Sequence, residues 1–372
     1  MVVKFHSMNI KLIPVLYTVV TILALANCVR ETDFLSSNED RNVLVVSGGF
    51  SDGAGPHVVR LTRPGDSNQQ AFEVVTGAEV VLSDDQGNTY TFQEVTPADG
   101  KPPFYQLSGV QGITGRIYTL DIQLPGGEHY RSRPETMPVQ VKIDSVGVQG
   151  ELFITNESNG AISKEQRAFA YAYTTVPDQA SGRYLRWDAE VVFIFNEIFK
   201  KYYPIPPPSY QCFVTNRISD QLIEMADLSD FQPGTSLYNR VGKRKIDFAF
   251  EHRICFVVYQ RTIGRDAYEY WKKIDQLISP TGTIFDTPPA RVFGNVDNLS
   301  DPGNPALGYF EISAVDTGRV YTLNGLLGDE FILNTVPYCQ YEYTHWPPVN
   351  HPECDNCLLL PSSSLEIPDW WQ

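Results

Sequence analysis

The sequence predicts a mainly β protein, with an N-terminal immunoglobulin-like β-sandwich at residues 42–138 and a larger β-rich domain with at least one amphipathic helix at residues 139–372. Three observations predict this class. Strand-like runs recur at roughly ten-residue spacing from residue 42 onward, separated by turns rich in glycine, proline and aspartate. The pattern resumes after PETMPVQ, where Pro134 and Pro138 indicate a domain boundary. The 20 tyrosines, 20 phenylalanines, 26 prolines and 27 glycines are typical of a turn-rich β protein.

Residues 1–27 have the features of an export signal. Lys4 and Lys11 precede an apolar run at residues 12–26, and no acidic residue occurs before Glu31. The run is shorter than the roughly 20 residues that cross a bilayer, so a permanent transmembrane helix is the weaker interpretation. We therefore expect this segment to be removed during export.

Cys28 follows the signal directly and is the predicted lipid attachment site. The preceding residues, LAN, resemble the bacterial lipoprotein signal, although Asn27 replaces the usual Ala or Gly. The alternative is a plain signal peptide that leaves Cys28 as a free thiol. Residues 28–41 are polar and without period, which predicts a tether between the lipid and the folded body.

The charge balance excludes one class of partner and limits another. The chain has 29 Lys plus Arg against 44 Asp plus Glu, a formal net charge of −15, and no basic patch with interleaved aromatics. Nucleic acid is therefore not an expected partner. An acidic body is also repelled by anionic lipid, so we expect the N-terminal lipid alone to hold the protein at a membrane.

The N-terminal strands alternate apolar and polar residues. In GRIYTLDIQL the period places Tyr118 and Leu120 on the core face with Ile122 and Leu124. Tyr118 has two interpretations, of which a plain core aromatic is favoured over a corner tyrosine. The predicted strands are NVLVVSGG, HVVRLTR, GAEVVLSDD, NTYTFQEV, FYQLSGV, GRIYTLDIQL and EHYRSR.

The second domain is predicted to contain a long strand and a helix. Alternate residues from Ile246 to Val258 are apolar apart from His252, which we interpret as a hydrogen-bonded core residue without chemistry. Asp266 and Glu269 resemble a capping box, and Ser279 and Pro280 end the helical pattern. The apolar helical positions between them are Ala267, Trp271, Ile274 and Ile278.

Four cysteines near turns are the disulfide candidates, namely Cys212, Cys339, Cys354 and Cys357. Exported chains meet oxidising conditions, which favours disulfides over a zinc site completed by His345 or His351, or a redox pair. A bridge between Cys354 and Cys357 would not tie the tail to another segment, so we expect Cys339 to pair with one of these two cysteines and Cys212 with the other. Cys255, in mid-strand, is then the unpaired one.

Searches for catalytic or metal-binding motifs find none. The chain lacks Gly-x-Ser-x-Gly, His-Glu-x-x-His and a phosphate-binding glycine loop. Asp286, Asp297 and Asp301 lack the spacing of a calcium loop and are interpreted as turn residues. We therefore predict no catalytic residue, metal or cofactor, although two of the many acids could still meet as a glycosidase pair.

A resemblance to a known family rests on the order and spacing of these segments: Cys28, VLVVSGG, GAEVVLSDDQGNTYTF, GRIYTL, RYLRWDAE, AYEYWKKI, GTIFDTPPARVFGNV, LGYFEIS, CDNC and PDWW. Together they resemble one family, the Bacteroidota lipoproteins known as domain of unknown function 4249. The resemblance spans roughly residues 28–371. The tail residues 358–366, LLLPSSSLE, differ from the usual shorter and more polar stretch, which leaves the packing of the tail open.

The resemblance implies a lipid-anchored protein of the outer membrane, on its cell-surface or periplasmic face. Such proteins are typically encoded beside a TonB-dependent receptor, which implies a non-catalytic, accessory role in nutrient uptake or outer-membrane transport. The family brings no catalytic residues. The alternative function is independent binding of a surface glycan or peptide through exposed aromatics, or hydrolysis at an unrecognised site.

Overall fold

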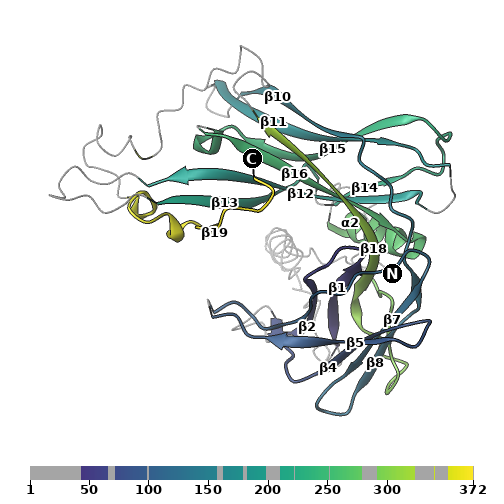
Figure 1. The fold of residues 1–372 in the computed structure, drawn as a ribbon. Coiled ribbons are helices and arrows are strands. Elements are labelled where there is room, and N and C mark those ends of the chain that lie inside the picture. Colours follow the sequence, from purple (N-terminus) through teal and green to yellow (C-terminus); the bar gives the residue numbers. More distant parts are fainter. Residues whose placement is uncertain are drawn as a thin grey trace, which may run out of the picture. The chain divides into compact units, whose positions relative to one another are not determined.

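The computed structural model describes residues 43–65, 72–98, 100–156, 162–178, 182–197, 210–221, 223–250, 252–278, 291–322, 339 and 351–371. The predicted signal, the tether and Cys28 lie outside the described residues. The chain divides into two units, residues 1–42 and 43–372, and all that follows concerns the second. This unit is mainly β with one long helix, as predicted (Figure 1). Within the described ranges, the structure contains no helix with the length and apolarity needed to span a bilayer.

The first strands form a two-layer sandwich. One layer has the order β8-β7-β4-β5 and the other β5-β6-β2-β1, and β5 belongs to both because its first half pairs with β4 and its second half with β6. The neighbours β2 and β6, and β4 and β7, are those of an immunoglobulin-like sandwich. All seven predicted strands are present. The strands are β1 (Val45–Ser51), β2 (His57–Pro64), β3 (Phe72–Val74), β4 (Glu79–Asp84), β5 (Thr89–Val95), β6 (Phe104–Leu107), β7 (Ile117–Gln123), β8 (His129–Ser132) and β9 (Glu135–Thr136).

Tyr118 on β7 is a corner tyrosine, the less favoured of the two interpretations from sequence. It is buried with Leu120, Ile122 and Leu124, as the alternation predicted. Its hydroxyl oxygen also accepts a hydrogen bond at 2.9 Å from the backbone N–H of Ile113, five residues upstream. This bond fixes the turn that leads into β7.

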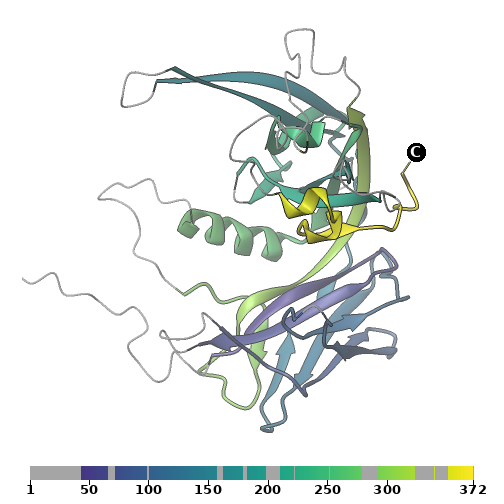
Figure 2. The ribbon, with the colours of Figure 1, turned by 90° about the vertical axis from the view of Figure 1, so that its left-hand side faces the viewer.

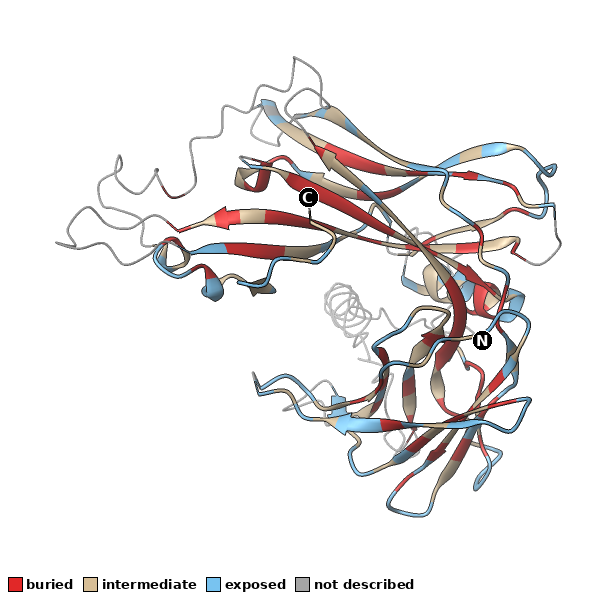
Figure 3. Cartoon of the chain, viewed as in Figure 1, coloured by how far each residue is buried: buried red, intermediate tan, exposed pale blue. Residues whose placement is uncertain are grey.

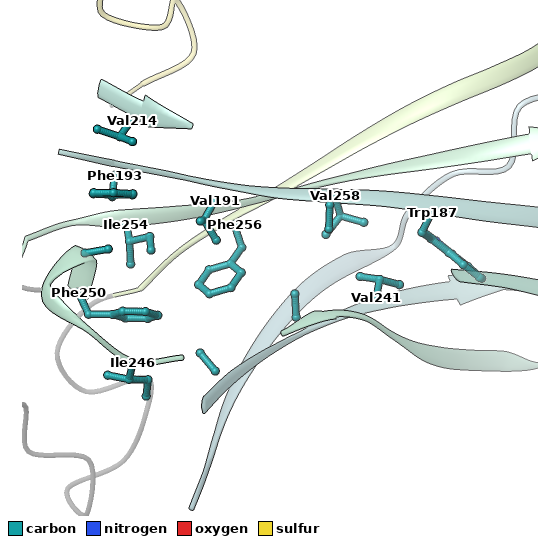
Figure 4. Close-up of a cluster of buried hydrophobic side chains, with 14 of the residues drawn as sticks. Trp187, Val191, Phe193, Val214, Val241, Ile246, Phe250, Ile254, Phe256 and Val258 are labelled. Atoms are coloured by element: carbon teal, nitrogen blue, oxygen red, sulfur yellow. The ribbon is translucent and has the colours of Figure 1, made fainter. Parts of the chain in front are cut away.

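The remaining strands form two facing layers. A three-stranded sheet, β10-β11-β15, faces the strands β18-β16-β12-β13-β19. The apolar core between them includes Trp187 and Phe256 from the second layer and Val241 from the first (Figure 4). Buried residues recur along the strands of both layers (Figure 3). The strands are β10 (Ser145–Asn156), β11 (Ile162–Thr175), β12 (Tyr184–Asn196), β13 (Gln211–Ile218), β14 (Glu224–Asp227), β15 (Ser236–Lys245), β16 (Ile254–Ile263), β17 (Val296–Asn298), β18 (Leu307–Thr322) and β19 (Ser363–Ser364).

One buried polar side chain joins the two layers across this core. The Oε1 atom of Gln260, on β16, accepts hydrogen bonds from the Thr174 hydroxyl at 2.7 Å and from the Trp187 indole N–H at 2.9 Å. Its Nε2 atom donates to the Val141 carbonyl at 2.9 Å. Because all these groups are paired, Gln260 fixes the position of β11 over β12 without an unsatisfied buried group.

The prediction of one long strand across residues 246–258 is wrong. The strand β15 ends at Lys245, residues Phe248–Phe250 form the short 3-10 helix η2, and β16 begins at Ile254. The break occurs at Asp247, whose Oδ1 atom accepts from the backbone N–H of Ala249 at 3.0 Å and stabilises the turn. His252 is consequently an exposed turn residue beside Asn196, 2.8 Å away, and not part of an apolar face.

The predicted helix is present as α2 (Arg265–Ile278). It begins at Arg265, so Asp266 lies in the first turn and not at the N-cap that the capping-box prediction gave it. Tyr268 and Tyr270 are buried, and Trp271 and Ile274 pack beside them against Tyr309 of β18. Of the predicted apolar helical positions, Ala267, Trp271 and Ile274 therefore pack against the sheet, whereas Ile278 is exposed.

The strand β18 connects the sandwich to the second layer (Figure 2). Its residues 307–313 pair in parallel with β1, and residues 313–322 pair antiparallel with β16. At Gly308, where φ is +85°, a Cβ atom would lie 2.0 Å from the Val46 carbonyl oxygen, so only glycine fits. With β17, which pairs with β8, strands from beyond residue 139 complete the sandwich.

A buried ion pair lies on β18, near the point where the pairing of this strand changes from β1 to β16. The guanidinium of Arg186, on β12, donates to both carboxylate oxygens of Glu311, on β18, at 3.1 Å. The Trp271 indole of α2 donates to the same carboxylate at 2.7 Å. Burial, the largest single influence, favours the neutral acid, but the charges of Arg186 and Arg261 and the hydrogen bonds to the carboxylate together outweigh it and lower the pKa of Glu311. The pair thereby joins β12, β18 and α2.

We predict that Glu311→Gln lowers the free energy of unfolding by about 3 kcal/mol, because it leaves the buried Arg186 charge without its main partner. The exposed pair of Arg133 with Asp297 is the matched control, and Asp297→Asn should cost no more than about 1 kcal/mol. Urea unfolding at pH 7 measures both. Equal losses in the two variants would show that Glu311 has no special role.

A second buried acid, Glu135, joins β9 to the same region. Its carboxylate accepts hydrogen bonds from the Tyr309 hydroxyl, from Asn295 Nδ2 at 2.9 Å and from the Ile312 N–H at 3.4 Å. Burial, the largest influence, outweighs these bonds and raises the pKa of Glu135 to about 7. The native state therefore binds a proton here that the unfolded chain releases above its ordinary pKa of 4.5.

We predict that the free energy of unfolding falls as pH rises from about 4.5 to about 7, because in this window the native state holds more protons than the unfolded state. The variant Glu135→Gln should lack this one-proton component. Urea unfolding of both proteins at half-unit pH intervals measures the difference. Parallel curves for the two proteins would contradict the assignment to Glu135.

Candidate ligand-binding site

The four disulfide candidates form two bridges at the C-terminal tail. Cys212 of β13 is joined to Cys357, and Cys339 is joined to Cys354. The buried Glu197 carboxylate accepts from the backbone N–H of Cys357 at 2.9 Å. Downstream, β19 pairs with β13, which places the tail along the edge of the sheet.

The last tryptophans complete the packing of the tail. Trp371 contacts the rings of Phe213 and Tyr321, with centroids 5.2 and 5.4 Å apart, and the Tyr321 hydroxyl donates to the Trp370 carbonyl at 3.2 Å. The segment LLLPSSSLE, which differs from the family's usual stretch, lies within this tail, and its Leu358 and Leu359 are exposed. The tail is a fastened structural element.

The other candidate residues do not assemble into a chemical site. Cys255 is a buried free thiol. His351 lies beside Glu353, and the exposed Asp297 pairs with Arg133. In the described ranges, no three His, Cys, Asp or Glu side chains are grouped closely enough to hold a metal ion. His345 and Asp286 lie outside those ranges.

We predict that peptide mapping under non-reducing conditions recovers the pairs Cys212–Cys357 and Cys339–Cys354. Burial raises the pKa of Cys255 to about 11, so native protein should not react with iodoacetamide at this thiol at pH 8, whereas unfolded protein should. Mass spectrometry before and after denaturation measures both. A bridge within Cys354-x-x-Cys357, or rapid native labelling of Cys255, would contradict the arrangement.

The outer face of the three-stranded sheet carries aromatic side chains, a residue type normally expected in the core. In β11, Ala168, Ala170 and Ala172 are buried against the core, while the alternate residues point to the other face. These alternate residues are Phe169, Tyr171 and Tyr173. The small residues therefore leave room for the large core side chains of β12 and β16, and the aromatics of β11 lie outside.

Three of the outer aromatics form a surface that we call the tyrosine platform, Tyr171, Tyr173 and Tyr238. The Tyr238 ring, on β15, lies 6.1 Å from Tyr171 and 6.0 Å from Tyr173 between centroids. Tyr238 is 68% exposed and Tyr173 38%. On β10, a Cβ atom at Gly147 would lie 3.0 Å from the Tyr173 ring, so glycine provides the space that this ring occupies.

Two arginines cover the aromatic side chains at the other end of this outer face. The Arg240 guanidinium lies 4.4 Å from the centroid of Phe169, and that of Arg167 lies 4.7 Å from the centroid of Phe153. Phe169 is buried beneath this cover. The platform, through Tyr173 and Tyr238, is consequently the more exposed part of this outer face.

A polar pocket of about 230 Å³ adjoins the platform at the edge of β15 that does not pair with β11. Tyr238 and Arg240 line the pocket and also belong to the outer face of the sheet. Its chemistry is mixed, with aromatic, amide and charged groups side by side. The lining residues are Trp187, Asp220, Gln221, Glu224, Met225, Tyr238, Asn239 and Arg240.

The two acids of the pocket are held by protein contacts. The Asp220 carboxylate pairs with Arg240 at 2.6 Å and Lys243 at 3.5 Å. Glu224 Oε1 accepts from the backbone N–H groups of Asp220, at 2.9 Å, and of Gln221. Burial, ahead of these bonds, raises the pKa of Glu224. These contacts hold residues 220–221 in place beside the pocket.

The inner face of the same sheet extends beyond the core. β15 pairs with β11 only from residue 167 onward, so the outer part of the β10–β11 hairpin is a two-stranded ribbon in the described structure. Leu152, Ile154 and Ile162 share the inner face of this ribbon, and each is about half exposed or more. We call these three residues the apolar overhang.

Neither the tyrosine platform nor the apolar overhang was predicted from the sequence. The available signal was the alternation of alanine with aromatic residues in RAFAYAYTT, which predicts a strand with a small-residue core face. The pocket has no local signal, because Trp187, Asp220 and Tyr238 come from separate segments.

The fold defines a mainly β protein with an immunoglobulin-like sandwich and a second β layer to which disulfides join the C-terminal tail. The family model described as a domain of unknown function, DUF4249, matches residues 30–319, and the chain belongs to that family. Comparison with curated proteins gave no match.

Proposed function

We propose that this protein is a non-catalytic, lipid-anchored accessory partner of a TonB-dependent receptor in the outer membrane, with a role in nutrient uptake or outer-membrane transport. The observation that carries the proposal is the apolar overhang, Leu152, Ile154 and Ile162. Membership of the family and the LAN-Cys28 sequence support the lipid anchor and the location.

The overhang needs a protein partner for a physical reason. A two-stranded ribbon is marginally stable by itself in water, and aliphatic side chains on its open face add a cost of hydration. Register places Ile154 diagonal to Ile162, so their side chains meet on one face. A clustered apolar surface of this kind is typical of a protein interface.

The charge distribution favours a docked protein over direct insertion into lipid. Lys164 and Gln166 share the inner face with the overhang, and the chain as a whole is acidic. Polar side chains around an apolar centre are typical of a protein interface. The ribbon contributes this interface, while the lipid at Cys28 keeps the protein at the membrane.

We predict that the double variant Leu152→Asp/Ile154→Asp, expressed in the native host, recovers less TonB-dependent receptor in a mild-detergent pull-down by roughly tenfold or more, because two charges would be buried in the interface. Quantitative mass spectrometry of the tagged, lipidated protein measures the recovery.

The control is Ile113→Asp/Leu299→Asp, since both residues are similarly exposed on the sandwich. It should leave the recovery unchanged. Wild-type protein that comes down without any receptor would refute the partnership, and equal loss in both double variants would remove the overhang from it.

A further inference from the structure

We infer that the tyrosine platform and the adjoining polar pocket together form a binding site for a neutral, hydroxyl-rich carbohydrate chain. The inference goes beyond the proposed partnership, because it concerns a soluble ligand and the opposite face of the sheet. Tyr238 is the residue that both parts share.

The platform has the properties of a stacking surface for sugar rings. The Tyr238 ring is tilted 35° from Tyr173 and 57° from Tyr171, so the three rings form a curved surface. Tyrosine offers a rigid apolar face with a polar hydroxyl at its end, at small cost in conformational entropy. The C–H groups on one face of a sugar ring can lie against such a surface while its hydroxyls project sideways.

The pocket supplies partners for those hydroxyls. Gln221 and Asn239 carry amides that both donate and accept, and Arg240 adds donors. The buried Trp187 provides an aromatic wall. A ligand with many hydroxyls satisfies such a mixed lining, whereas an aliphatic side chain would leave its polar groups unpaired.

The electrostatics favour a neutral ligand. The charge of Asp220 is balanced by Arg240 and Lys243, so the pocket does not require a cation to compensate it. The net charge of −15 opposes an anionic polysaccharide. A peptide is the less favoured occupant, because extended peptides bind by adding a strand to a sheet edge, and the platform is a sheet face.

The test is isothermal titration of the purified full chain in mild detergent with maltohexaose, cellohexaose, xylohexaose and mannohexaose. We expect at least one of these to bind, and Tyr238→Ala to weaken it by roughly tenfold, the effect of losing about 1.4 kcal/mol of contact. Tyr238→Phe should retain most of the affinity, because it keeps the ring face. Gln221→Ala should weaken binding through the pocket alone.

Tyr210→Ala is the matched control, since Tyr210 is 52% exposed and precedes β13, whereas Asp220 of the pocket follows that strand. It should bind as wild type does. Absence of binding to all four oligosaccharides, an unchanged affinity in Tyr238→Ala, or binding of a tryptic casein digest in their place would overturn the inference. None of these outcomes bears on receptor recovery, which depends on the overhang.

Discussion

The shared pairing of β18 is the constraint on which the rest of the structure depends. This strand of 16 residues pairs with β1 over its first part and with β16 over its second, so the sandwich and the second layer are one hydrogen-bonded sheet. Glu311 lies in the first part and draws Arg186 and Trp271 onto the strand. The segments that resemble the family, RYLRWDAE, AYEYWKKI and LGYFEIS, each place a residue in this cluster.

The strand β11 has small residues on one face and aromatics on the other because of the core that this sheet forms. Trp187, Phe193 and Phe256 project from the second layer and fill most of the space beneath the three-stranded sheet. Interiors are packed near crystal density, so the facing strand can present only small residues there. The alanines of β11 meet this requirement. Its aromatics then lie on the outer face, where Gly147 provides space for the Tyr173 ring and Arg240 covers Phe169.

Local patterns predicted the fold well and the site poorly. Alternation located all seven N-terminal strands and helical spacing located α2, because period and turn residues are properties of neighbouring positions. It failed at residues 246–258, where the single side chain of Asp247 turns the chain within an otherwise regular alternation. The pair Arg186–Glu311 spans 125 residues, so no local pattern could reveal it. Buried polar pairs of this kind depend on which distant strands the topology brings together.

The two surfaces of the three-stranded sheet can act together because they occupy opposite faces. Even-numbered residues of the hairpin, including Leu152, Ile154 and Ile162, point inward, and the odd-numbered Tyr171 and Tyr173 point outward. A receptor that covered the inner face would therefore leave the platform accessible to ligand. Among the described residues, no third strand pairs with the outer part of the hairpin, whereas the platform lies where β15 supports β11. A partner would thus order the ribbon, while the ligand surface is already held by the core.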